Sequence, residues 1–129
     1  GIRLAAIEYG ATTARPRRVA WTDAVAAKYA VGINGPMMVL TKVDCLAGAN
    51  SFNICYGYKN GSSRLEVFKR DECYLRESIP EYTSYNGFKE LNEDLPQSLD
   101  LAIKDFEKFT HGKVAAISTG PERDQIIIN

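Results

Sequence analysis

A lysine and an aspartate follow a short apolar run in the first half of the chain. The run Met37–Leu40 continues into Thr41-Lys42-Val43-Asp44 and lies between Asn34-Gly35-Pro36 and Gly48. Its length and its flanking residues predict a buried strand. Open α/β sheets bind their ligands at the carboxyl ends of strands, so Lys42 and Asp44 are candidates for a ligand site.

The pair Lys42 and Asp44 suits a guanine base. A carboxylate accepts two parallel hydrogen bonds, and guanine offers two donors, its N1–H and its 2-amino group. Adenine lacks both donors and would leave the carboxylate unpaired, which costs roughly 1–3 kcal/mol. The lysine stem can lie along the base while its ammonium stays in water. The alternative is that both residues merely close a strand at the surface, and these four residues alone leave that alternative open.

A second candidate stretch, Gly10-Ala11-Thr12-Thr13-Ala14-Arg15-Pro16-Arg17-Arg18, combines hydroxyls with three arginines. Pro16 fixes its own φ and biases Arg15 away from helix, so the stretch predicts a loop. Guanidinium groups bind carboxylates or phosphates in a two-pronged manner. The stretch therefore indicates a loop that binds small anions, with a solvated basic loop as the alternative.

Two helices are expected to support these loops. Thr22 is the expected N-cap of a helix that runs to about Ile33, with Trp21 packed against it. Its core stripe is expected at Val25, Tyr29 and Ile33. A second helix opens at Pro96, ends at His111-Gly112 and buries one apolar face, formed by Leu99, Ala102, Ile103, Phe106 and Phe109.

Several strands are expected beside Met37–Leu40. Phe52–Tyr58 and Arg64–Lys69 flank Asn60-Gly61 and predict a β-hairpin, whereas residues 71–95 predict only loops or edge elements. Val114–Ile117 ends in a further loop, Ser118-Thr119-Gly120-Pro121, and Gln125–Ile128 is the last strand. Helix–strand units with ligand-type loops indicate an α/β fold with a largely parallel sheet flanked by helices.

Composition limits the classes of function. The 129 residues suffice for one domain, residues 1–129, and the formal net charge of zero argues against nucleic acid as a partner. No run is long enough to span a membrane. Three cysteines without C-x-x-C spacing and a single histidine suggest no metal site, and free thiols fit the cytoplasm.

The loop at 10–18, the motif at 41–44 and the loop at 118–121 together resemble the C-terminal part of the adenylosuccinate synthetase family. The resemblance covers the whole chain and is strongest over 8–58 and 113–128. It implies a P-loop NTPase-like fold, of which this chain would be the C-terminal portion of a larger domain. The family joins IMP and L-aspartate into adenylosuccinate in AMP biosynthesis, with GTP as co-substrate and Mg²⁺ as cofactor.

The resemblance also implies roles for particular residues. Residues 8–18 would form the mobile aspartate loop, with contacts from Ala11, Thr12, Thr13, Ala14, Arg15, Pro16 and Arg17. Arg15 would also reach the ribose of IMP, and Arg17 would also contact GTP. The guanine pocket would be formed by Lys42, Val43 and Asp44 and completed by Ser118, Thr119 and Gly120.

The sequence departs from the family pattern in several places. Ile7, Ala14 and Ala20 stand where the family usually has asparagine, glycine and glycine. The family's glycine-rich phosphate loop, catalytic aspartate and catalytic histidine have no counterpart here, since His111 comes too late in the order. We therefore expect this chain to be an excised piece of a homodimeric ligase. The piece is expected to contain no catalytic residue and to be inactive alone, and Mg²⁺ is expected to bind the missing part.

Two other classes of function compete with this one. One is a stand-alone guanine-nucleotide-binding module without catalysis, for which an aspartate loop would have no use. The other is a protein-interaction or RNA-binding domain that uses the arginine loop, which the zero net charge disfavours.

Overall fold

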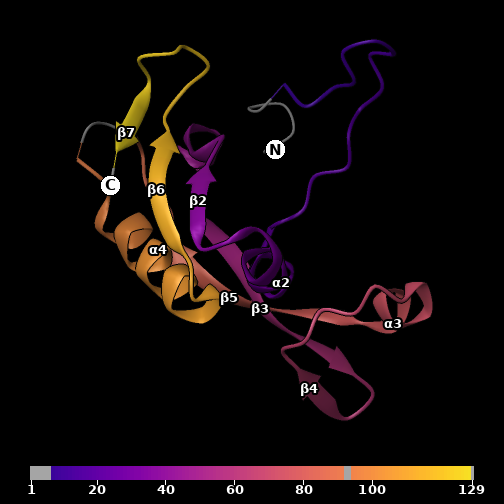
Figure 1. The fold of residues 1–129 in the computed structure, drawn as a ribbon. Coiled ribbons are helices and arrows are strands. Elements are labelled where there is room, and N and C mark those ends of the chain that lie inside the picture. Colours follow the sequence, from indigo (N-terminus) through magenta and orange to yellow (C-terminus); the bar gives the residue numbers. More distant parts are fainter. Residues whose placement is uncertain (1–6, 92–93, 129) are drawn as a thin grey trace.

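The computed structural model describes residues 7–91 and 94–128 and contains two small mixed sheets (Figure 1). In the first sheet, β3 (Ser51–Asn60) pairs in parallel with β1 (Thr22–Asp23) and antiparallel with β4 (Ser63–Leu65) and β5 (Ile79–Asn86). The hairpin predicted around Asn60-Gly61 is confirmed, with Gly61 at a φ of 61°, but its second strand is Ser63–Leu65 and not Arg64–Lys69.

The second sheet carries the strands that precede the candidate loops. Here β2 (Met37–Leu40) pairs in parallel with β6 (Lys113–Ser118), and β7 (Ile126–Ile128) pairs antiparallel with β6. The expected largely parallel sheet is therefore wrong for the described residues, since most pairings are antiparallel. A short turn can join only antiparallel neighbours, and β3 and β4 are joined in that way.

Helix α2 (Ala24–Asn34) begins one residue later than predicted. Asp23, not Thr22, is the N-cap: its Oδ1 accepts from the Ala26 N–H at 3.0 Å, and its Oδ2 accepts from the Tyr58 hydroxyl at 2.5 Å. This carboxylate thus satisfies the helix start and ties it to β3.

The predicted core stripe of α2 is only partly correct. Val25 is buried, whereas Tyr29 is 38% exposed and Ile33 is 64% exposed. The core contacts of α2 come from its first turn, at Ala24, Val25 and Ala27. The second half of the helix therefore leaves the core that the described residues form.

Residues 71–95 are more regular than the sequence indicated. They contain helix α3 (Glu72–Glu77), capped by Asp71, and the eight-residue strand β5. Pro80 lies within β5, opposite Tyr58. Proline is tolerated there because β5 is an edge strand and needs no hydrogen bond on its outer side.

Helix α4 (Gln97–Thr110) confirms the predicted second helix and forms the centre of the core. Its apolar face packs on both sheets, against Phe52 and Ile54 of β3 and Val114 and Ile117 of β6. His111 ends the helix in the left-handed conformation with a φ of 58°. Gly112 follows in a tight space, because a Cβ there would lie 2.5 Å from Met38 Cε and 3.1 Å from the Pro36 carbonyl oxygen.

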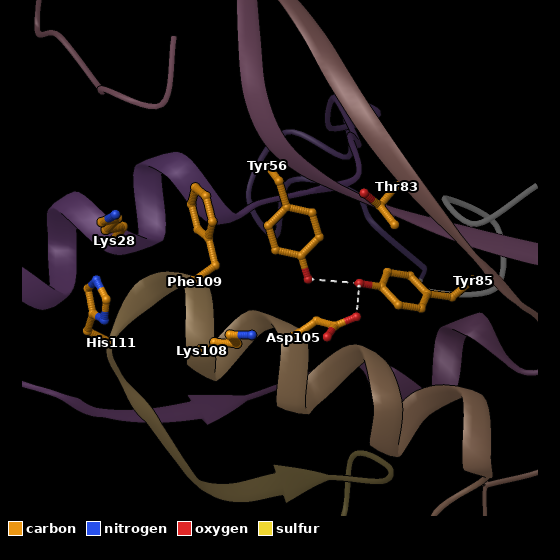
Figure 2. Close-up of a pocket in the computed structure, with 8 residues that line it drawn as sticks. All are labelled: Lys28, Tyr56, Thr83, Tyr85, Asp105, Lys108, Phe109 and His111. Carbon is orange, nitrogen blue, oxygen red and sulfur yellow. Dashed lines mark hydrogen bonds between the residues drawn. The ribbon is translucent and has the colours of Figure 1, made fainter. Parts of the chain in front are cut away.

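A chain of hydroxyl hydrogen bonds attaches α4 to the first sheet (Figure 2). The Tyr85 hydroxyl donates to Asp105 Oδ2 at 3.0 Å, so the Tyr56 hydroxyl, also 3.0 Å away, must donate to Tyr85. Burial raises the pKa of both tyrosines. These three hydrogen-bonded side chains border a cavity of about 440 Å³ that also contacts His111. The cavity lies at the amino end of β6, away from the candidate loops.

No helix in the described part of the chain is long and apolar enough to cross a membrane.

Two glycines give opposite predictions for stability. A Cβ on Gly87 would lie 1.7 Å from the carbonyl oxygen of Ala49, whereas one on Gly32, inside α2, would meet nothing within 4 Å. We expect Gly87→Ala to lower the free energy of unfolding by about 1–3 kcal/mol. Gly32→Ala should raise it by about 0.5–1 kcal/mol. Urea unfolding measures both, and a tolerated Gly87→Ala would contradict the close approach of Gly87 to Ala49.

Candidate functional site

The pairing of β2 with β6 places two of the three candidate loops together. The strands run in parallel with Leu40 opposite Ile117, so the segments that follow Leu40 and Ser118 leave the sheet at the same end. Figure 1 shows the loop before β1 extending past this end as well. The structure therefore gathers at one end of the sheet the segments that the sequence singled out separately.

The first of these segments turns sharply after β2. Lys42 adopts the left-handed conformation with a φ of 59°, which redirects the chain into the 3₁₀ helix η1 (Val43–Leu46). Val43 is buried at 7% exposure, and η1 contacts β6. The predicted strand β2 is confirmed, but its predicted burial is wrong: Met37 is 67% and Val39 is 57% exposed, because only the face with Met38 and Leu40 packs on the core.

Asp44 lies half-buried in η1 and retains acceptor capacity. Its Oδ2 faces the thiol of Cys45 at 3.8 Å. Burial, reinforced by the negative charge of Asp44, raises the pKa of that thiol, which therefore stays protonated at neutral pH. A carboxylate offers about four acceptor positions, so Asp44 can still receive two parallel N–H donors.

A small cavity lies behind these residues. It has a volume of about 190 Å³ and borders Thr41, Lys42 and Val43 on one side and the apolar face of α4 on the other. Among the described residues, its lining does not include Asp44 or the loop after β6. A base read by Asp44 would therefore bind on the outer side of the loops and not in this cavity.

The loop after β6 is closed by its own hydrogen bonds. Ser118 Oγ donates to the Gly120 carbonyl at 2.9 Å, and the Thr119 N–H donates to the Gln125 carbonyl at 2.9 Å. A Cβ on Gly120 would lie 2.1 Å from Gln125 Oε1, so a side chain here would displace the Gln125 amide from its hydrogen bond with the Glu122 N–H. The Thr119 amide is therefore already used by a hydrogen bond within this part of the chain.

The arginine-rich loop has the form of an irregular hairpin. Tyr9 and Pro16 form an antiparallel bridge, and the Gly10 N–H donates to the Arg15 carbonyl at 2.8 Å. Ala14 has a φ of 51°, a conformation that glycine adopts freely and that costs other residues roughly 1–2 kcal/mol. Residues 11–20 are all exposed, which leaves the hydroxyls of Thr12 and Thr13 accessible to a ligand.

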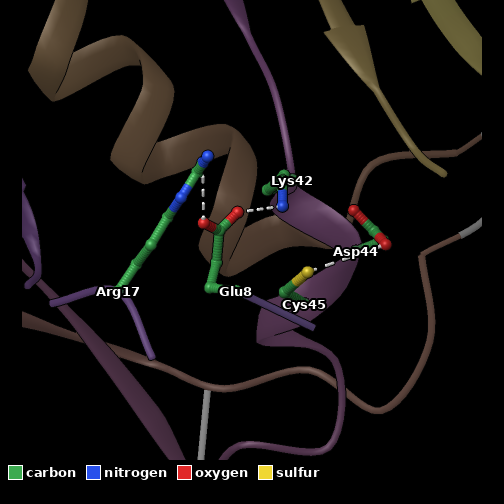
Figure 3. A network of polar contacts seen from close by, with 5 residues as sticks. All are labelled: Glu8, Arg17, Lys42, Asp44 and Cys45. Carbon is green, nitrogen blue, oxygen red and sulfur yellow. Dashed lines mark hydrogen bonds and ion pairs between the residues drawn. The ribbon is translucent and has the colours of Figure 1, made fainter. Parts of the chain in front are cut away.

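Glu8 joins the arginine-rich loop to the segment after β2 (Figure 3). Its Oε1 pairs with Lys42 Nζ, and its Oε2 lies 3.4 Å from Arg17 Nη1. The hydrogen bond from Lys42, aided by the charges of Lys42 and Arg17, lowers the pKa of Glu8, which stays ionised at neutral pH. Sequence reasoning gave Glu8 no role, because its partner Lys42 lies 34 positions away.

Metal-binding chemistry finds no support in the part of the chain that the structure describes. Asp, Glu, His and Cys side chains form no group of three or more there that could hold an ion.

Comparisons with known proteins give one consistent result. The family model for adenylosuccinate synthetase matches residues 1–127. The chain is 41% identical to the adenylosuccinate synthetase of Thermodesulfovibrio yellowstonii and 42% identical to that of Caldicellulosiruptor bescii, and it covers 30% of each relative while 94% of this chain is matched. It thus spans about a third or less of the length of these relatives.

A solved structure, described as fully ligated adenylosuccinate synthetase from Plasmodium falciparum, superposes with a TM-score of 0.91 at 31% sequence identity. The match covers 99% of this chain and 33% of that one. By its sequence and its fold, the chain belongs to the adenylosuccinate synthetase family.

Proposed function

We propose that the protein containing this chain joins IMP and L-aspartate to give adenylosuccinate, with GTP converted to GDP and phosphate. The observation that carries the proposal is the convergence of the three loops: the parallel pairing of β2 with β6 joins two of them, and the ion pair of Glu8 with Lys42 brings in the third. Family membership supports the same reaction.

In this proposal the guanine of GTP is read at the end of β2. The Asp44 carboxylate accepts from N1–H and the 2-amino group, and the stem of Lys42 lies along the base. Val43 anchors η1 in the core, and Ser118, Thr119 and Gly120 close the other side of the pocket. The left-handed turn at Lys42 redirects the chain into η1, the element that carries Asp44.

The arginine-rich loop is proposed to hold the aspartate substrate. The hydroxyls of Thr12 and Thr13 and the guanidinium of Arg17 are exposed and lie on a hairpin that presents them to solvent. Arg17 is also proposed to contact GTP, and Arg15 to contact the ribose of IMP. The remaining members of the segment, Ala11, Ala14 and Pro16, would shape the loop and offer backbone groups.

The chemistry assigned to these residues is binding and orientation. In the proposed reaction, phosphate is placed on the 6-oxygen of IMP, and the amine of aspartate then displaces it. Such phosphoryl transfer depends mainly on positioning and charge stabilisation. The groups that hold Mg²⁺ and deprotonate IMP are proposed for the part of the protein beyond this chain, and the homodimeric state and cytoplasmic location stay predictions.

A stand-alone guanine-nucleotide module remains the second candidate. It shares the pocket at Asp44 but needs no aspartate loop. Assaying the complete protein with IMP, aspartate and GTP, each omitted in turn, separates the two: the ligase forms adenylosuccinate only with all three present, whereas a module forms none.

Asp44→Asn should impair the use of GTP, because an amide cannot accept both guanine donors. We expect the KM for GTP to rise about tenfold or more, since roughly 1–3 kcal/mol of interaction is lost. Steady-state kinetics of the complete protein measures the effect. Asp94→Asn, at an exposed position before α4, is the matched control. An unchanged KM for GTP in Asp44→Asn would contradict the guanine assignment.

Arg17→Leu should weaken the binding of aspartate far more than that of IMP. The change removes a two-pronged partner of a carboxylate, and we expect the KM for aspartate to rise about tenfold or more. Arg18→Leu, at the next exposed arginine, controls for the loss of positive charge. Equal increases in both KM values would count against the division of roles within the loop.

A further inference from the structure

We propose that Glu8 is a positioning residue that couples the occupancy of the guanine pocket to the order of the aspartate loop. The inference rests on the proposed function, because it concerns the substrates assigned to Lys42 and Arg17. It goes beyond that function by giving a role to a residue that contacts neither substrate in the proposal.

Glu8 is attached to the loop by backbone as well as by side chain. Its carbonyl oxygen accepts from the Arg17 N–H at 3.0 Å, which closes the base of the hairpin, next to the bridge between Tyr9 and Pro16. Its carboxylate lies between the cations of Arg17 and Lys42 (Figure 3). One residue thus fixes the base of the loop and contacts the segment that reads guanine.

The two ion pairs differ in geometry, and this difference suits a coupling role. Lys42 is in close contact with Oε1, whereas Arg17 Nη1 lies 3.4 Å from Oε2, longer than the about 2.7–2.9 Å of a strong charge-assisted hydrogen bond. Arg17 can therefore turn toward the carboxylate of a substrate while Lys42 stays paired with Glu8. The loop can accept aspartate without losing its connection to the guanine pocket.

The direction of the coupling follows from side-chain entropy. Lys42 and Arg17 are more than half exposed, at 54% and 58%, and holding two such long side chains in one ion-paired geometry costs conformational entropy. A guanine that fixes Lys42 also fixes Glu8, and through Glu8 the base of the hairpin. Aspartate then meets a loop that is already ordered, and by linkage aspartate must favour GTP by the same factor.

Exposed ion pairs of this kind add little to the stability of a fold. Removing the Glu8 charge should therefore change how strongly GTP lowers the KM for aspartate, and it should leave the folded structure intact. This separates a positioning role from a merely structural one.

The test measures the KM for aspartate in the complete protein at low and at saturating GTP. For the wild type, we expect saturating GTP to lower this KM at least about fivefold, within the usual range of couplings between sites. In Glu8→Gln the change should shrink to less than about twofold, while kcat with all substrates saturating stays within about threefold of wild type. Glu8→Asp, too short to span both cations, should show the same loss, and it serves as the second variant if Glu8→Gln folds poorly.

Two further variants make the result specific. Glu66→Gln removes a different exposed carboxylate, 3.6 Å from Arg64, and should keep the full dependence on GTP. Lys42→Met should lose it, and Glu8→Gln should have no added effect on the dependence in that background. An active wild type whose Glu8 variants keep the dependence overturns the inference alone. A wild type that forms no adenylosuccinate overturns the proposed function and the coupling with it.

Discussion

The parallel pairing of β2 with β6 is the constraint on which the candidate site depends. Leu40 lies opposite Ile117, so the turn at Lys42 and the loop after Ser118 leave the sheet at one end. Parallel neighbours need a long crossover, and here the crossover contains β3, β5 and α4. The packing of α4 against both sheets holds this register, because Leu99, Ile103 and Phe106 share one core with Val114 and Ile117.

Ion pairs attach the arginine-rich loop to this end of the sheet. The hairpin at 8–17 has little apolar contact of its own, since residues 11–20 are exposed. It is held in the structure by its bridge and by the ion pairs of Glu8 with Lys42 and Arg17. A loop attached mainly by charge can open and close at low cost, as a loop that admits a charged substrate must. In the proposed reaction, the end of the sheet would bind GTP and this loop would bind aspartate.

The sequence predicted best those elements whose signals are local. The periodicity of α4, the Asn60-Gly61 turn and β6 were all confirmed. Strand β5 was predicted only as a loop or an edge element, because its tyrosine-rich stretch contains Pro80 and its strand structure depends on pairing with β3. The prediction that Tyr29 and Ile33 are buried was wrong, because the spacing of apolar residues does not show how far along α2 the core extends. The three motifs were recognised from their residue types. The contact of Glu8 with Lys42 could not be predicted in this way, because the two residues come together only in the folded chain.

Hydrogen–deuterium exchange on the complete protein tests most directly the claim that the three loops form one site. Added GTP should slow amide exchange in residues 41–46 and 118–125 together, and aspartate added with GTP and IMP should slow it in residues 8–18. Protection confined to the cavity near Tyr56 and His111, with no change in the three loops, would contradict the account.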